Sequence, residues 1–329
     1  MKVSIYDVAK KSGLSVVTVS RVINNAGSVR EKNREKVLAA MKELDYRPNA
    51  AARSLARGKT GIIGLSITTL QDMFLDAVVK EVNDRLAEKG YFLALSVSTD
   101  GADSIFSDLF QEDRVDGVIV LSPLEEDPYV TELKKKKIPF VMLDNQHKHA
   151  SVSSVLVDNF KGGYEATKHL IELGHRRIAH IKGPEPFLSS VERERGFLQA
   201  MQEAGLTPFA IEQGDFSITS GYQIASGWIQ AETLPTAVFA ADDYMAFGVM
   251  DAFKNEGIRI PGDVSLVGYD NHPFTSEFQP GLTTVRQPAE KMGAQGVDLL
   301  LKWIEGTGKR SVTIQLEPEL IIRGSTGRV

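Results

Sequence analysis

Hydrophobic positions in the first sixty residues recur at helical spacing. Apolar side chains between residues 5 and 12 return every three or four positions, which predicts a short helix. Gly13 ends it, because glycine readily adopts the positive φ of a tight turn. Ser15 is a favourable N-cap for a second helix, which we expect from Val16 to about Asn24.

A third helix is predicted immediately afterwards. Residues 28–31, Ser-Val-Arg-Glu, have the form of a capping box, and Val37, Leu38, Met41 and Leu44 form an apolar stripe behind it. Two short helices around a glycine turn, braced by a third, are typical of a helix-turn-helix, whose second helix enters the major groove of DNA. The alternative is a small three-helix subdomain without a role in DNA binding.

The period of the pattern changes at residue 61. Short apolar runs now alternate with helical stretches: IIGLSI, YFLALSV, VDGVIVLS, PFVMLD, SVLVD, RIAHIKG, AVFAAD and VSLVGYD. Strands that alternate with amphipathic helices favour parallel sheets covered on both faces. About 270 residues with two such series predict two doubly wound α/β subdomains, and open sheets of this kind bind ligands beyond the carboxyl ends of their strands.

Charge separates the chain into the same two parts. The net charge of the 329 residues is -5, which by itself argues against nucleic-acid binding. Residues 1–58, however, hold twelve basic and five acidic side chains, for a net +7, so the remainder carries -12. Such an asymmetry indicates a basic nucleic-acid module joined to an acidic body.

The second predicted helix offers side chains suited to reading DNA. Val16 and Val17 stand at its start, where an apolar group can meet a thymine methyl, and Arg21 can make two hydrogen bonds to guanine. Ser20 is better suited to a phosphate. Because neither valine can make a side-chain hydrogen bond, discrimination at these two positions would rest on methyl contacts and shape.

Two stretches carry a resemblance to a known family. IYDVAKKSGLSVVTVSRVINN and the later REKVLAAMKELDYRPNAAARSLARGKTGIIG closely resemble the LacI family of bacterial transcription regulators. The resemblance implies a DNA-binding domain over residues 1–58 with a hinge helix at about 49–57 that orders on operator DNA, in a dimer. Leu55 matches the leucine that wedges into the minor groove. The DNA-binding residues implied are Ser15, Val16, Val17, Thr18, Ser20, Arg21, Asn24, Asn49, Arg53 and Leu55.

The same resemblance extends into the body of the chain. It implies that residues 60–329 form an effector-binding and dimerisation core similar to periplasmic sugar-binding proteins. One subdomain would comprise about 61–158 and 288–320, and the other about 159–287. A ligand would lie in the cleft between them, where closure of the subdomains is a natural switch.

Strand ends supply candidate ligand-binding residues. Asp144, Asp242 and Asp270 each end an apolar run, and a carboxylate can accept two sugar hydroxyls. The resemblance implies the effector-binding residues Thr68, Phe74, Asp144, Ser189, Arg193, Phe216, Asp242, Asp270 and Gln287. Asp242 departs from the family pattern, in which asparagine is common. The alternatives are ordinary structural roles: core aromatics for Phe74 and Phe216, turn or strand-end carboxylates for Asp144 and Asp270.

These observations predict a ligand-controlled transcription regulator, a repressor that binds near-palindromic operator DNA as a homodimer and responds to a sugar or sugar derivative. A phosphorylated carrier protein as corepressor and a free-standing sugar-binding protein are the alternatives. We expect no enzymatic activity, catalytic residue, metal or cofactor, since no such constellation is found and the chain has no cysteine. Without an apolar leader or membrane-length run, we expect a cytoplasmic protein that contacts no membrane.

Overall fold

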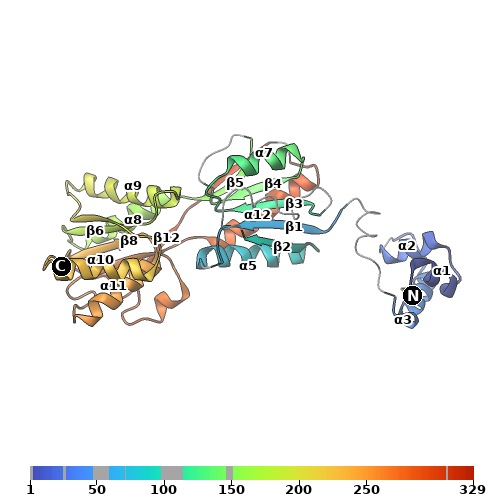
Figure 1. Ribbon diagram of the computed structural model, residues 1–329, viewed down its shortest axis with the longest axis horizontal. Coiled ribbons are helices and arrows are strands. Elements are labelled where there is room, and N and C mark those ends of the chain that lie inside the picture. The colour runs from blue at the N-terminus through green and yellow to red at the C-terminus, as the bar shows by residue number, and fades with distance from the viewer. Residues whose placement is uncertain are drawn as a thin grey trace. The chain divides into compact units, whose positions relative to one another are not determined.

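The computed structural model of the chain describes residues 3–24, 27–46, 59–70, 72–97, 114–145, 151–308 and 310–329. The fold divides into two compact units, one built mainly from the chain up to residue 61 and the other from residue 62 onward. Both are drawn in Figure 1. The predicted hinge helix at 49–57, with Asn49, Arg53 and Leu55, lies outside the described residues.

The first unit is a cluster of three helices, α1 (Ile5–Ser12), α2 (Val16–Ile23) and α3 (Glu31–Glu43). Val8, Val19 and Val37, one from each helix, are fully buried in its small core. Gly13 ends α1 at φ 67°, as expected, and the Ser15 hydroxyl caps α2 by accepting a hydrogen bond from the Thr18 N–H at 3.2 Å. This geometry confirms the helix-turn-helix expected from the sequence.

Two details of the third helix differ from the prediction. It begins at Glu31 with Arg30 as its N-cap and no side-chain capping bond, so the capping box at residues 28–31 was wrong. Leu38 is 51 % exposed, while Ala40 is buried in its place. A helix this close to the end of a small core can bury only a narrow stripe, and Val37 and Ala40 occupy it.

The second unit contains two six-stranded sheets. The first has the order β11-β5-β4-β3-β1-β2, and all its neighbouring strands pair in parallel. Its strands are β1 (Ile62–Ile67), β2 (Phe92–Val97), β3 (Gly117–Leu121), β4 (Phe140–Leu143), β5 (Ser153–Val157) and β11 (Thr313–Leu316). Its helices are α5 (Met73–Glu88), α7 (Asp127–Lys135) and α12 (Ala289–Ile304), of which α5 and α12 pack together.

The second sheet has the order β12-β10-β9-β8-β6-β7, and only the pair of β10 and β12 is antiparallel. Its strands are β6 (Ile178–Lys182), β7 (Ala210–Gln213), β8 (Ala237–Ala240), β9 (Ser265–Asp270), β10 (Thr283–Arg286) and β12 (Glu319–Ile321). Its helices are α8 (Asn159–Glu172), α9 (Leu188–Glu203), α10 (Ile218–Gln230), α11 (Asp243–Asn255) and the short 3-10 turn η2 (Pro273–Ser276). In Figure 1, α8 and α9 cover one face and α10 and α11 the other.

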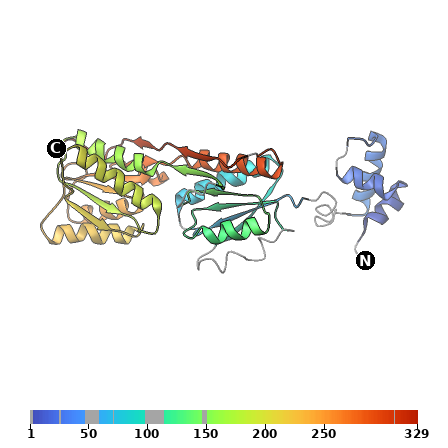
Figure 2. The same ribbon diagram turned by 90° about the horizontal axis from the view of Figure 1, so that it is seen from above.

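The chain passes between the two sheets after β5, after β10 and after β11. Figure 2 shows these connections running side by side, and the strand pairings β5–β11 and β10–β12 join them. Because β12 pairs with β10, residues 319 and 320 lie in the second sheet, although the resemblance assigned them to the first subdomain. The last passage comes just before them, at Glu317 and Pro318.

Burial on both faces of the sheets explains why apolar runs in the sequence predict the strands. Parallel strands covered on both faces lose water from both sides, so successive residues are apolar. Strand β3 is buried along its whole length, and β8 likewise. Within the described residues, no helix is both long and apolar enough to cross a membrane.

Candidate functional site

The start of α2 presents the side chains predicted to read DNA. Val17 is 60 % exposed, so its apolar side chain is available for contact. Arg21 is also exposed, one turn further along the helix. Val16 packs partly against the core of the first unit, so it presents less of its surface than Val17.

The polar residues of this helix are partly engaged with one another. The hydroxyls of Ser15 and Thr18 lie 2.9 Å apart, and the Asn24 amide donates to the Ser20 hydroxyl at 3.4 Å. These contacts hold the side chains at the helix surface without burying them. The helix therefore offers the exposed Arg21 and the exposed methyl groups of Val17 beside a row of small polar groups.

A cavity lies in the second unit, beyond the carboxyl ends of strands from both sheets. All nine residues that the sequence singled out line it: Thr68, Phe74, Asp144, Ser189, Arg193, Phe216, Asp242, Asp270 and Gln287. Thr68 and Asp144 directly follow β1 and β4 of the first sheet. Asp242 closely follows β8 of the second sheet, and Asp270 ends β9. The topology thus brings together residues that are far apart in the chain.

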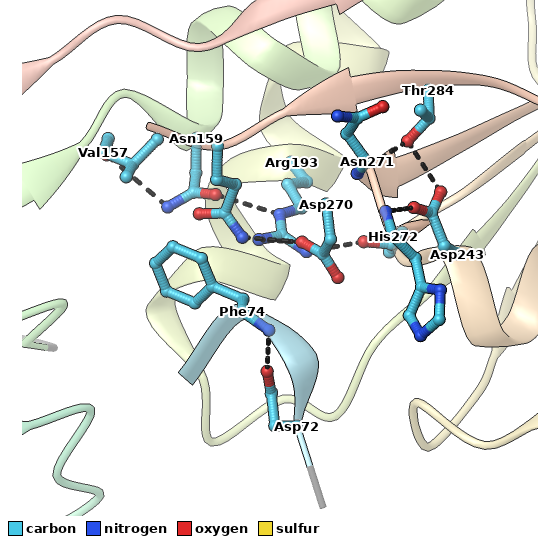
Figure 3. A network of polar contacts seen from close by, with 12 residues as sticks. Asp72, Phe74, Val157, Asn159, Arg193, Asp243, Asp270, Asn271, His272 and Thr284 are labelled. Carbon is cyan, nitrogen blue, oxygen red and sulfur yellow. Dashed lines mark hydrogen bonds and ion pairs between the residues drawn. The ribbon is translucent and has the colours of Figure 1, made fainter. Parts of the chain in front are cut away.

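Arg193 lies at the centre of the polar network (Figure 3) and is 4 % exposed. Its Nε donates to Asn159 Oδ1 at 2.9 Å, and its Nη1 donates to the carbonyl oxygen of Ala241 at 2.6 Å. Its Nη2 lies 3.7 Å from Asp270 Oδ1, and the guanidinium carbon is 3.7 Å from the centre of the Tyr269 ring. These contacts hold a buried cation in one orientation.

Asp270 links the guanidinium to the chain passage that follows β10. Its Oδ1 accepts a hydrogen bond from Gln287 Nε2 at 2.6 Å. Burial raises the pKa of Asp270 well above its ordinary value, and Arg193 opposes that rise. Asp270 and the next residue, Asn271, both have positive φ, at 108° and 56°, which Asp and Asn tolerate better than most residues.

Asp144 and Asp242 face the cavity from the two different sheets. Burial raises the pKa of Asp144 to about 6, and Arg193 and the Ser122 hydroxyl oppose the rise. Burial raises the pKa of Asp242 to about 7, in spite of its bond from the Met245 N–H and the nearby Arg193. Asp242 caps α11 through that bond, which is 2.9 Å long.

A second polar network supports the loop after β9. The carboxylate of Asp243 accepts from the His272 N–H at 2.7 Å and from the Thr284 hydroxyl at 2.6 Å, and that hydroxyl accepts from the Asn271 N–H at 3.2 Å (Figure 3). Burial raises the pKa of Asp243 to about 8. Sequence reasoning missed this residue, because nothing in the run AVFAADD distinguishes a supporting carboxylate from one that lines the cavity.

Aromatic rings form the apolar part of the cavity wall. Phe187 and Phe216 are tilted against each other with 5.8 Å between ring centres, and Phe216 has a φ of 64°. Phe74 is 8 % exposed and belongs to the core cluster of the first sheet, so it is a core aromatic whose edge reaches the cavity. An apolar ring beside carboxylates is a typical combination for sugar binding.

Sequence reasoning missed five residues of the lining: Thr69, Asp72, Leu75, Ser122 and Phe187. Asp72 is the most informative of them. Its Oδ1 caps α5 by accepting from the N–H groups of Phe74 and Leu75, at 2.9 and 3.1 Å, and burial raises its pKa. An acidic residue directly before the apolar-periodic stretch from Met73 was the available signal.

No group of three or more histidine, aspartate or glutamate side chains among the described residues is arranged to hold a metal ion. The cavity can instead hold an organic ligand by accepting hydrogen bonds on carboxylates, donating from Arg193 and stacking on aromatic rings.

Comparison with known proteins agrees with the fold of both units. The family described as "Bacterial regulatory proteins, lacI family" matches residues 4–49, and a "Periplasmic binding protein-like domain" matches residues 167–326. The chain is 39 % identical to the HTH-type transcriptional repressor PurR of Proteus mirabilis, over 98 % of this chain and 96 % of that protein.

Solved structures give the same result. The structure of the lac repressor dimer bound to operator and the anti-inducer ONPF matches with a TM-score of 0.91 and 31 % identity, over 99 % of this chain and 100 % of that one. The complex of the transcriptional regulator CelR with cellobiose matches with a TM-score of 0.75 and 33 % identity, over 98 % and 99 % of the two chains. The chain therefore belongs to the lacI family of bacterial regulatory proteins and is a DNA-binding regulator of transcription rather than an enzyme.

Proposed function

We propose that this regulator is a repressor that binds a near-palindromic operator as a homodimer and is controlled by a small polyhydroxylated effector in the cavity of its second unit. The observation that carries the proposal is that Asp144, Asp242 and Asp270, from the strand ends of two sheets, line one cavity together with Arg193. Acting on chromosomal DNA, the protein would work in the cytoplasm.

The exposed start of α2 supports the DNA-binding half of the proposal. We assign base contacts to Val16, Val17 and Arg21, and backbone or positioning contacts to Ser15, Thr18, Ser20 and Asn24. Asn49, Arg53 and Leu55, which lie outside the described residues, complete the set on the strength of the resemblance alone. A dimer would place its two reading helices about 34–36 Å apart, one helical turn of DNA, which requires an operator with approximate two-fold symmetry.

The cavity supports the regulatory half. A ligand there touches residues of both sheets at once, so its binding free energy depends on how the two subdomains are oriented. Any orientation that the ligand favours, and the operator does not, weakens DNA binding. The coupling is reciprocal: operator and effector must change each other's affinity by the same factor.

The chemistry of the lining favours a sugar-like ligand. Carboxylate oxygens accept from hydroxyl groups, Arg193 can donate to ring or hydroxyl oxygens, and Phe216 presents an apolar ring to the C–H face of a pyranose. The structurally similar CelR was solved with cellobiose, which supports the same class of ligand for this chain.

A DNA footprint tests the proposal directly. The purified full chain should protect a near-palindrome upstream of its own gene or a neighbouring gene at modest salt, and one member of a sugar panel should change the protection. If no palindrome is protected, the proposed operator recognition is wrong. If a palindrome is protected but no sugar changes it, the small-molecule effector is wrong, and a phosphorylated carrier protein becomes the corepressor to test.

A further inference from the structure

We propose that the effector of this cavity carries an ammonium group beside its hydroxyls, as a hexosamine does. The inference rests on the proposed function of the cavity as the effector site, and it specifies the class of ligand. It is drawn from the charges and hydrogen-bond donors that line the cavity, and from one buried acceptor that has no partner.

The lining is strongly acidic. Asp72, Asp144, Asp242 and Asp270 all contribute carboxylates, whereas Arg193 is the single cationic side chain among the described residues of the wall. Fully ionised, these groups would sum to -3, and burial raises the pKa of all four acids, so without a further cation the wall takes up protons in place of part of this charge. A ligand with a positive charge would reduce this excess, and a ligand with a phosphate or carboxylate would increase it.

Arg193 has little capacity left to balance the other acids. Its Nε and Nη1 donate to Asn159 and to the carbonyl oxygen of Ala241, and its Nη2 faces Asp270. Asp72 and Asp242 each accept backbone N–H bonds at the start of a helix, which are neutral donors. Among the described residues of the wall, these acids therefore have no second cation.

Gln287 adds an unused acceptor to the carboxylates of the wall. Gln287 is 5 % exposed and points its Nε2 at Asp270, while its Oε1 has no hydrogen-bond partner among the residues that the structure describes. A buried acceptor without a donor is destabilising, because burial has removed its hydrogen bonds to water. An ammonium group brings three donors and no acceptor, so it suits both this amide oxygen and the carboxylates.

Size and shape restrict the ligand further. The cavity offers about 70 Å³ to the centres of water molecules, which is room for a small ligand. Phe187 and Phe216 add an apolar wall. A metal ion is a poor alternative, because no group of three or more acidic or histidine side chains in the described residues is arranged around one point. A small organic cation with hydroxyl groups fits all these features.

Asp242→Asn provides a sharp test. The asparagine keeps an oxygen for the Met245 N–H and so keeps the cap of α11, but it removes the charge. Asp144→Asn is a second variant, because asparagine tolerates the φ of 49° at that position. Asp251→Asn is the matched control, since Asp251 lies exposed on α11, the helix that Asp242 caps, and outside the cavity wall.

Titration calorimetry on the full-length protein should compare matched pairs: glucosamine with glucose, galactosamine with galactose, and mannosamine with mannose, with glucose 6-phosphate as an anionic probe. We expect at least one hexosamine to bind about tenfold or more tightly than its hexose, and glucose 6-phosphate not to bind. Asp242→Asn and Asp144→Asn should each weaken that hexosamine about tenfold more than they weaken its hexose. Asp251→Asn should change neither.

Other outcomes overturn the inference and separate it from the proposed function. If a hexose binds as tightly as its hexosamine, or if Asp242→Asn tightens both, the ammonium preference is wrong while the sugar-controlled repressor stands. If no hexose or hexosamine binds to the wild-type protein, the ammonium preference is wrong. The footprint with the wider sugar panel then decides whether the proposed effector class also falls.

Discussion

Arg193 Nε donates a hydrogen bond to Asn159 Oδ1 at 2.9 Å, and Asn159 is the first residue of α8, just after the chain leaves the first sheet. The contact joins the central cation of the cavity to a passage between the two sheets. A change in the orientation of Arg193 is therefore tied to a change in the passage, which is the relationship an effector-driven switch requires.

Asn159→Ala should remove this hydrogen bond between Arg193 and the start of α8. Without the Oδ1 acceptor, one guanidinium N–H stays buried and unpaired, so we expect effector affinity to fall about tenfold while the protein still folds. Asn159→Asp keeps the acceptor and should retain or strengthen binding. Isothermal titration with the effector identified by footprinting measures both. Equal losses in the two variants would show that Asn159 does not act through Arg193.

Arg193→Ala should abolish the effector response and leave operator affinity unchanged. The side chain lies in the cavity of the second unit, whereas the residues assigned to DNA lie in the first. A gel shift titration with and without effector gives both quantities. A variant that still responds normally would remove Arg193 from the effector site.

Gly163→Ala should destabilise the second unit. The added Cβ would collide with the backbone carbonyl of Arg193, because α8 and α9 approach closely at this point. Overpacking of this kind costs about 1–3 kcal/mol. Gly227→Ala is the control, since a Cβ there meets open space near the end of α10, and alanine should stabilise by up to about 0.5–1 kcal/mol. Urea unfolding midpoints that shift equally would contradict the close approach.

Stability should fall as pH rises through the range of the buried cavity acids. Burial raises the pKa of Asp242 to about 7 from an ordinary 3.8, while Arg193 opposes the rise and Asp72 and Asp215 reinforce it. Between these two values the folded chain holds a proton that the unfolded chain has lost. The free energy of unfolding should therefore decrease with pH, by up to about 1.4 kcal/mol per unit for that proton, until pH passes about 7.

Asp242→Asn has no such proton to lose, so it should flatten the slope between about pH 4 and 7. Asp144 and Asp270, whose pKa values are also raised by burial, should maintain the rest of it. Urea unfolding of the ligand-free chain at pH 5, 6, 7 and 8 measures the slope, with Asp251→Asn as the control. An unchanged slope in Asp242→Asn would mean that Asp242 is already ionised at pH 5.

Leu55→Ala should weaken specific operator binding far more than non-specific binding. A wedged leucine contributes only where the duplex is kinked, and unstacking a base step involves a few kcal/mol. We expect about a tenfold or larger loss on the operator and little change on random DNA. Leu38→Ala, at an exposed position of α3, is the matched control. Equal losses of affinity for operator and random DNA would refute the proposed insertion of Leu55 into the minor groove.

The sequence alone determined the local structure and the order of elements. Ser15 and Gly13 marked the helix boundaries because an N-cap oxygen and a positive φ are local requirements. Apolar runs predicted the strands, since a strand covered on both faces must be apolar throughout. Local signals were weaker at Ser28, where a plausible capping box is not used, and at Leu38, where the small core has no room.

The tertiary structure alone decided how the residues of the candidate site come together around one cavity. The family resemblance named nine residues, but only the strand order and the passages between sheets place them around one cavity. Support from Asp243 and the position of the Gln287 amide depend on contacts between distant segments, which no local pattern records. Hydrophobic period and caps act over a few residues, whereas charge balance in a buried cavity is set by whichever strand ends the topology brings together.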